Sequence, residues 1–166
     1  MRASYLTALL LALAMPVQTL FASAPASSIV MLRNADEDAC ARKAAIKHDV
    51  SLVTLAAIRM VEGGRAGHLS WNTNGTADVG PWQINSMHFT RLKEQGVDIE
   101  ALINDVCVNA DIAAQILSEA QDGQSIGDGA LSYHSRTPKY RAKYRKALLR
   151  AITTIEAHMK KVLETL

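Results

Sequence analysis

The chain has 166 residues, which is enough for one domain with its own hydrophobic core. Its formal net charge is only +2, so the composition gives no indication that the protein binds nucleic acid. The five histidines lack the spacing of a metal site and no C-x-x-C motif occurs, so we expect neither a metal nor another cofactor.

The N-terminus has the features of an export signal. An apolar run over residues 6–15 is too short to span a bilayer comfortably, and Ala24-Pro25-Ala26 fits a signal-peptidase site. Ala22-Ser23-Ala24 also fits, and an uncleaved anchor outside the cytoplasm is the alternative to cleavage. The sequence thus predicts three segments: a signal peptide (1–26), a linker (27–35) and a single domain (36–166).

The chain contains two cysteines, Cys40 and Cys107. In an oxidising compartment an even pair favours one disulfide, and two separate buried thiols are the alternative. The bond would close a loop of roughly 68 residues and would stabilise the fold by about 4 kcal/mol in the chain-entropy model.

The first part of the domain predicts two helices. Residues 36–48 have helical spacing, with acidic side chains in the first turn. Ser51 can cap a second helix that is apolar on nearly all sides and ends at Glu62, where Gly63 and Gly64 stop it. Such a helix is usually central in a fold and gives a rigid base for a site.

A polar, glycine-containing stretch covers residues 63–80, and loops of this length tend to be functional or disordered. Asn74-Gly75 predicts a short hairpin within it. Four further helices are expected over residues 86–95, 98–104, 106–120 and 126–133, with Ser86, Asp105 and Ser125 as caps of the first, third and fourth.

Pro138 suits the first turn of a last helix. Its apolar stripe comprises Tyr140, Tyr144, Leu148, Ile152, Ile155, Met159, Val162 and Leu166, and its opposite face is basic, with Lys139, Arg141, Lys143, Arg145, Lys146 and Arg150. Such a face is usually only solvated, and DNA or anionic lipid binding is the alternative. The fold class is therefore mainly α: a compact helical domain with at most a small β-hairpin beside the site.

Glu62 and Asp78 are the carboxylates best suited to chemistry on a sugar. Glycoside cleavage needs a protonated acid at the leaving oxygen and a group that stabilises positive charge at the ring. Glu62 ends an apolar helix, where burial favours the neutral acid, whereas Asp78 lies in a polar loop that favours the ionised form. The alternatives are a surface residue at a helix end for Glu62 and a loop-capping aspartate for Asp78.

Four short motifs follow one another along the chain: Val61-Glu62, Asp78-Val79-Gly80-Pro81-Trp82-Gln83-Ile84-Asn85, Cys107-Val108-Asn109-Ala110 and Leu131-Ser132-Tyr133-His134-Ser135. In this order, over residues 37–145, they resemble the lysozyme-like lytic transglycosylases of bacteria, in the soluble-lytic-transglycosylase (SLT) group. The closest type is the small exported form associated with secretion systems, conjugation and pili. The cysteine placement agrees with this resemblance, and residues 78–86 are also similar to a segment of animal-type lysozymes.

Three positions depart from the family pattern. Gly63 replaces the serine that usually follows the catalytic glutamate, Pro81-Trp82 replaces Leu-Met, and His134-Ser135 replaces Asn-Ala. Trp82 can either stack on a sugar ring or pack in the core. His134 can still donate a hydrogen bond, but with a charge that depends on pH near neutrality.

The resemblance implies an enzyme that cuts the β-1,4 bond between N-acetylmuramic acid and N-acetylglucosamine in peptidoglycan. It implies that Glu62 is the single catalytic acid and base, which closes a 1,6-anhydro ring with help from the substrate's acetamido group. Tyr133 would hold Glu62 or that acetamido group. Gln83 and Asn85 would line the groove, with helix capping as the alternative for Asn85. Further substrate contacts would come from Trp82, His134 and Asp78.

The resemblance implies that the partners are peptidoglycan glycan strands and components of a secretion, conjugation or pilus apparatus. We expect the protein to be a monomer and to act in the periplasm. Two other functions compete with this one. A hydrolytic lysozyme of the same fold is favoured if Asp78 points at the substrate. A non-catalytic glycan-binding scaffold subunit has no need of Glu62, so the intact glutamate argues against it.

Overall fold

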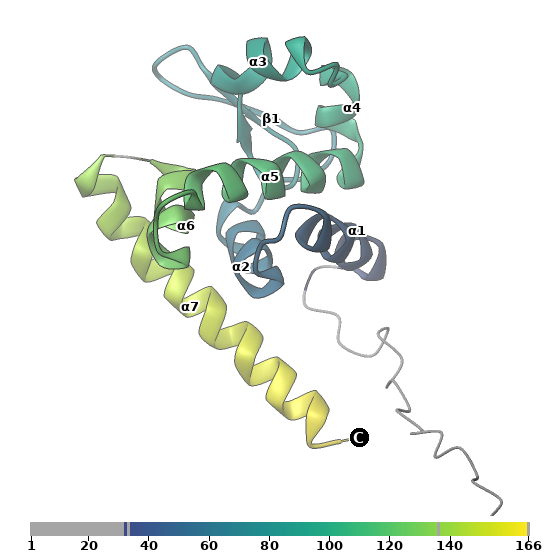
Figure 1. Cartoon of the computed structure of the whole chain (residues 1–166), viewed down its shortest axis with the longest axis vertical. Helices are drawn as coiled ribbons and strands as arrows, with labels where there is room; N and C mark the ends of the chain where they lie inside the picture. The colour runs from purple at the N-terminus through teal and green to yellow at the C-terminus, as the bar shows by residue number, and fades with distance from the viewer. Residues whose placement is uncertain (1–31, 33, 136, 166) are drawn as a thin grey trace, which may run out of the picture.

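The computed structural model describes residues 32, 34–135 and 137–165 (Figure 1). The predicted signal peptide and most of the predicted linker lie outside these residues. Within them, no helix combines the length and the apolar character needed to cross a bilayer.

Seven α-helices dominate the described part of the chain, so the mainly α fold class is confirmed. They are α1 (Ala35–Lys47), α2 (Leu52–Glu62), α3 (Phe89–Glu94), α4 (Ile99–Asn104), α5 (Val106–Gln121), α6 (Ile126–His134) and α7 (Pro138–Leu163), with a 3₁₀ turn, η2 (Ser86–His88), before α3.

Most helices begin at the residue that the sequence predicts. The side chains of Ser51, Asp105 and Ser125 each accept a hydrogen bond from a backbone N–H in the first turn of α2, α5 and α6. The prediction that Ser86 caps a helix is wrong. Asn85 is the cap, since its Oδ1 accepts the backbone N–H of Met87 at 2.9 Å, as the capping alternative for Asn85 expected. Ser86 already lies inside the first turn, and its hydroxyl instead accepts the N–H of Ala77.

The predicted hairpin is present and forms part of a three-stranded antiparallel sheet. Strands β1 (Leu69–Trp71), β2 (Ala77–Val79) and β3 (Ile84–Asn85) lie in the order β1-β2-β3. Asp78 on the central strand pairs with both Ser70 and Asn85, so these three side chains share one face of the sheet. The third strand has only two residues, too few to show the alternation by which a sequence predicts a strand.

The core surrounds α2 and α5. Leu55, Ala56, Ala57 and Ile58 of α2 are fully buried, as expected for a helix that is apolar on nearly all sides. In Figure 1, α5 crosses the middle of the molecule, with the sheet, α3 and α4 on one side and α1 and α2 on the other. Helix α7 packs along α2 and then runs past the other helices.

The apolar stripe of α7 is only partly as predicted. Tyr144, Leu148 and Ile155 are buried, but Tyr140 is 54% exposed because it lies in the first turn of α7, before the helix reaches the core. Leu166 lies outside the described residues.

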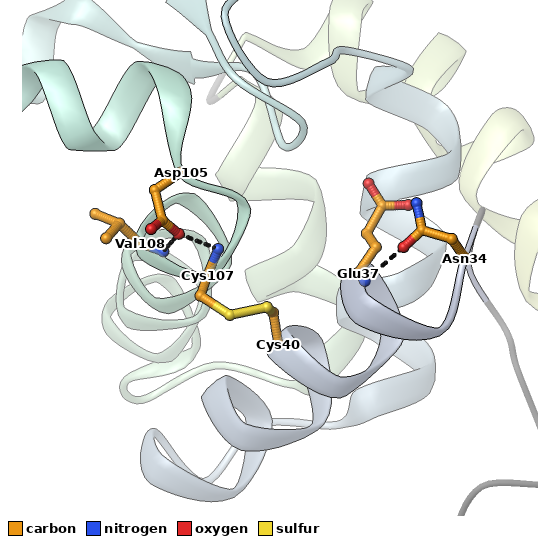
Figure 2. The surroundings of a disulfide bond; sticks show 6 residues. All are labelled: Asn34, Glu37, Cys40, Asp105, Cys107 and Val108. Atoms are coloured by element: carbon orange, nitrogen blue, oxygen red, sulfur yellow. Dashed lines mark hydrogen bonds between the residues drawn. A yellow bond between two sulfur atoms is a disulfide. The ribbon is translucent and has the colours of Figure 1, made fainter.

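The disulfide between Cys40 and Cys107 is formed and joins α1 to α5 (Figure 2). Close to the bond, the backbone N–H groups of Cys107 and Val108 donate to Asp105, which caps α5. Asn34 likewise caps α1, by accepting the N–H of Glu37. The bond therefore connects two helices whose starting points are each fixed by a side chain.

Candidate active site

Glu62 is the last residue of α2, and its position follows from the way the helix ends. Gly63 adopts the left-handed conformation (φ +67°), which glycine tolerates best, and its N–H donates to the backbone carbonyl of Arg59. The Glu62 side chain is 14% exposed. Its Oε1 atom is buried and has no hydrogen-bond partner within the described part of the chain. A buried acceptor without a protein partner is rare, which makes Glu62 a candidate for contact with a water molecule or a ligand.

Gly64 brings the end of α2 against the turn between β2 and β3. A β-carbon at this position would lie 2.1 Å from the Gly80 carbonyl oxygen and 2.5 Å from Nε2 of Gln83, so only glycine fits. Gln83 itself has a positive φ of 49°, and its Nε2 donates to the Gly80 oxygen at 2.9 Å. The predicted site residue Gln83 therefore packs against Gly64, which is two residues after Glu62 in the chain. The Gln83 side chain is half-buried there.

Tyr133 of α6 lies near both acidic side chains that the sequence singled out. Burial, followed by the charges of Glu62 and Asp78, raises the pKa of Tyr133 well above its usual value. Its hydroxyl donates to the backbone carbonyl of Trp82 at 3.0 Å. The hydroxyl proton is therefore directed at the turn and not at Glu62.

His134 and Tyr144 complete the surroundings of Glu62. Nδ1 of His134 lies 3.6 Å from Oε1 of Glu62, and the imidazole stacks on the Tyr144 ring, with centroids 4.2 Å apart and planes 3° from parallel. Burial is the main cause that raises the pKa of Tyr144, and the charge and hydrogen-bonding capacity of Glu62 raise it further. From the sequence, Tyr144 is expected only in the apolar stripe of α7, because a tyrosine on a buried helix face carries no signal beyond packing.

Asp78 is occupied by the hairpin. Its Oδ2 accepts from the Asn72 amide at 2.8 Å, and its Oδ1 accepts from the Asn85 amide at 2.7 Å. The Asn85 amide also donates to Thr76, while its oxygen caps η2. Both residues therefore act within the loop. Asn85 caps a helical turn, as its alternative proposed, and Asp78 holds the loop through side-chain amides where its alternative proposed backbone amides.

Trp82 belongs to the core. Its side chain has no exposed surface, and the indole N–H donates to the Leu55 carbonyl at 3.0 Å. The Arg59 guanidinium lies 5.7 Å from the ring centroid. A ring without an exposed face offers no platform for a sugar, so the structure favours core packing over the predicted stacking role.

Asn109 positions the turn between β2 and β3, a role that its place in the third sequence motif does not predict. It is fully buried, and its amide donates to the carbonyls of Val79 (3.1 Å) and Leu102 (2.9 Å). Its oxygen accepts the backbone N–H of Trp82 at 2.9 Å. One side chain of α5 thus holds the turn that carries Gln83 and packs against Gly64.

A partly buried carboxyl group beside two neutral tyrosines and an imidazole can transfer protons at a bond placed next to it. In the described part of the chain, no three side chains of the metal-ligating types come together. A mainly helical domain with an acid at the end of its central helix and a small sheet beside it is the arrangement expected of a lysozyme-like enzyme that cleaves glycosidic bonds.

Comparison with known proteins identifies the family. Residues 39–145 match the Transglycosylase SLT domain family, and the chain belongs to it. The chain is 30% identical to Protein IpgF of Shigella flexneri over 127 residues, which cover 73% of this chain and 84% of the relative. It is 32% identical to Invasion protein IagB of Salmonella typhi over 89 residues, which cover 53% of this chain and 56% of the relative. The protein is thus a lytic transglycosylase whose substrate is peptidoglycan.

Proposed function

We propose that Glu62 performs both proton transfers of this lytic transglycosylase. The observation that carries the proposal is the buried Oε1 atom of Glu62, which has no partner among the residues that the structure describes. The other candidate, Asp78, has both carboxylate oxygens engaged by asparagine amides. Of the two acids, only Glu62 has a carboxylate oxygen without a hydrogen bond in the described part of the chain.

The reaction balances with one residue. Protonated Glu62 donates its proton to the oxygen that links N-acetylmuramic acid to N-acetylglucosamine, and the bond from the muramic acid C1 to that oxygen breaks. The acetamido group of the muramic acid stabilises the positive charge at C1. The Glu62 carboxylate then takes the proton of the 6-hydroxyl as that oxygen bonds to C1. The 1,6-anhydro ring closes, Glu62 is protonated again, and no water is consumed.

The substrate contacts divide between exposed and buried side chains. Gln83 and His134 are partly exposed next to Glu62 and are positioned to bind sugar hydroxyls or acetamido groups. Tyr133 holds the turn through the Trp82 carbonyl, so it supports the site from within. Trp82, Asn85 and Asp78 support the turn and the hairpin, and we assign none of them a direct contact.

The enzyme acts in the periplasm, after export by the predicted signal peptide, on the wall around an envelope-spanning secretion, conjugation or pilus machine. The apolar run and cleavage motif at the N-terminus support export. The similarity to a protein named for invasion supports a role beside such a machine.

Replacing Glu62 with glutamine tests the proposal, because the amide keeps the shape of the side chain but cannot donate a proton as an acid. We expect Glu62→Gln to lose about a thousandfold in the rate of product release from purified peptidoglycan. Glu156→Gln, on the exposed face of α7, is the matched control and should keep the wild-type rate. Wild-type activity in Glu62→Gln would contradict the assignment.

Mass spectrometry of the soluble products tests the chemistry. Muropeptides one water lighter than the hydrolytic product contain the anhydro ring. Reducing muramic acid ends would instead indicate a lysozyme and would return Asp78 to consideration. Binding to peptidoglycan without any product would favour the scaffold function.

A further inference from the structure

The charge of the chain is divided unequally between α7 and the rest of the molecule. Eight of the 18 lysines and arginines lie in α7, which carries one acidic residue, Glu156, and so has a net charge of +7. The remainder of the chain has ten basic and 15 acidic residues, a net charge of −5. The near-neutral total therefore conceals one strongly basic helix on an acidic body, an asymmetry typical of proteins that bind an anionic surface.

Four of these cations form a stripe along one side of α7, here called the basic stripe: Lys139, Lys143, Lys146 and Arg150. They recur every three or four residues, so they follow one another along about 16 Å of helix. All four are exposed, and none of them forms an ion pair in the described part of the chain, whereas Arg141 is held by Asp128. The basic stripe therefore presents positive charge that no acidic side chain neutralises.

The basic stripe lies on the side of α7 that faces away from the active site. At about 100° per residue, Lys146 and Arg150 lie across the helix from Tyr144 and Leu148, which each come two residues earlier. Tyr144 and Leu148 are buried, and Tyr144 belongs to the surroundings of Glu62. In Figure 1, α7 runs along one edge of the molecule, with α2 and α6 on its inner side and no described element on its outer side in this view.

We propose that the basic stripe is a docking surface for the headgroups of an anionic phospholipid bilayer. A long helix at the edge of the molecule can lay such a stripe along a flat surface, where several lysines and arginines are attracted together by the negative surface potential. The apolar side of α7 is already buried against α2, so the contact is peripheral and electrostatic, without insertion of the helix. The inference goes beyond the proposed function and does not depend on the role of Glu62.

Two features of the basic stripe favour a bilayer over the carboxylates of the wall. A glycan strand bound at Glu62 lies on the Tyr144 side of α7, so the opposite side is left for a second surface. Three of the four stripe residues are lysines, whose point charges suit a continuous anionic surface, whereas arginine reads a single carboxylate through paired hydrogen bonds. The cell envelope, in which the substrate peptidoglycan lies, contains such bilayers. A protein docked in this way keeps its active site on the side away from the membrane.

Sedimentation with vesicles tests the proposal on the full chain. One vesicle is neutral phosphatidylcholine, and the other contains about one third phosphatidylglycerol. The readout is the ratio of the partition coefficients for the anionic and the neutral vesicles. We expect a ratio of about a hundredfold at low salt, which falls toward one at about 0.5 M salt because the charges are then screened within a few ångströms. The apolar N-terminus is the same in every variant, so differences between variants report the basic stripe.

The stripe variant Lys143→Gln/Lys146→Gln removes two charges from the middle of the basic stripe. At about fivefold per cation near an anionic surface, the ratio should fall about 25-fold. The matched control, Lys43→Gln/Lys93→Gln, removes the same charge from exposed positions on α1 and α3 and should change the ratio by less than about twofold. Glutamine has nearly the helix propensity of lysine, and thermal unfolding of both variants checks the fold.

Labelling of amines in the unchanged protein gives a second test that needs no variant. With anionic vesicles present, Lys139, Lys143 and Lys146 should react at least about threefold more slowly with an amine reagent, as measured by mass spectrometry. Lys43 and Lys93 should react as they do without vesicles. This pattern also shows which side of the molecule faces the membrane.

The proposal is overturned by equal partition into anionic and neutral vesicles, by equal losses in the stripe variant and the control, or by uniform protection of all these lysines. It is also overturned if the stripe variant loses binding to purified peptidoglycan or to duplex DNA while its vesicle ratio stays at the wild-type value. The peptidoglycan assay contains no lipid, so the stripe variant should release muropeptides at the wild-type rate. A lower rate would place the basic stripe in substrate binding and likewise overturn the proposal. Failure of the proposed function is a separate result, since only Glu62→Gln reports on it.

Discussion

The end of α2 and the β1–β2 hairpin each present a carboxylate close to Tyr133, but their surroundings differ. On the hairpin, each oxygen of Asp78 accepts a side-chain amide hydrogen bond, and the acid connects Asn72 to Asn85. At the end of α2, one oxygen of Glu62 is buried with no partner in the described part of the chain. The hairpin uses its acid to hold a loop together, while the helix leaves one oxygen of its acid without a hydrogen bond.

The end of α2 and the β2–β3 turn that it meets are held in place by different means. A buried ion pair anchors α2 one turn before Glu62, where Arg59 contacts Glu37 through two nitrogens. The β2–β3 turn is held by neutral hydrogen bonds from Asn109. Charge therefore fixes the helix, amide groups fix the turn, and Gly64 allows the two to meet. Breaking each connection separately shows how far the position of Glu62 depends on it.

The largest effect is expected from removing the anchor of α2. Arg59→Met leaves the Glu37 carboxylate buried without its guanidinium, which should lower the free energy of unfolding by about 3–5 kcal/mol. The matched control is Arg91→Met, which breaks an ion pair whose side chains are 37% and 47% exposed, and it should cost at most about 1 kcal/mol. Denaturant unfolding of both variants measures the difference. Equal losses would mean that burial of the α2 pair does not matter.

Removing the clamp on the turn should have the next largest effect. Asn109→Ala leaves the buried N–H of Trp82 and two carbonyls without their side-chain partner, and we expect a loss of about 3 kcal/mol. The control is Asn104→Ala, which removes an exposed hydrogen bond from the side-chain amide to the Glu100 backbone carbonyl. It should change stability by less than about 0.5 kcal/mol. At temperatures where Asn109→Ala is still folded, its activity should fall as well, since the turn carries Gln83. Full activity in that variant would separate the turn from catalysis.

Asp78→Asn tests the comparison between the two acids directly. Asparagine offers one acceptor oxygen where Asp78 offers two, so one of the amides from Asn72 and Asn85 loses its bond. We expect a loss of about 1–2 kcal/mol in stability and less than tenfold in activity, against the about thousandfold loss for Glu62→Gln. Activity is measured by release of muropeptides from purified peptidoglycan. A loss equal to that of Glu62→Gln would make Asp78 a second catalytic acid.

The sequence predicted the elements more fully than the site. Helix caps such as Ser51 and Asp105, the Asn74-Gly75 turn and the cysteine pair are local signals, and each appears in the structure as expected. The position of Glu62 at a helix end was also readable, because Gly63 follows it directly. The caps, the turn and the helix end depend on residues close together in the chain. The disulfide was predictable because the sequence contains only two cysteines.

The parts that were missed depend on contacts between distant residues. Tyr144 lies 82 residues after Glu62 by number and shares a helix face with Leu148 and Ile155, so nothing in its neighbourhood marks it. Trp82 looked equally suited to a sugar or to the core, and only the Leu55 carbonyl, 27 residues away, decides between them. The roles of Asn85 and Ser86 were exchanged because neighbouring residues can both cap a turn, and the sheet determines which of the two does so.

The smallest effect concerns His88, on the sheet side of the molecule. Burial, and then the charge of Arg91, lowers the pKa of His88 below its usual value of 6.5, while Glu119 opposes this. A lowered pKa means that the folded protein binds fewer protons than the unfolded chain near pH 6.5, so stability falls as the pH drops below that value and is fully present above it. His88→Gln should remove this dependence, a change below about 1 kcal/mol in unfolding measured between pH 7 and pH 5. His88 belongs to the turn η2 directly before α3, so this substitution should change the pH dependence of stability and leave that of the rate as in wild type. A rate profile that shifts in His88→Gln would contradict this separation of the two sides of the molecule.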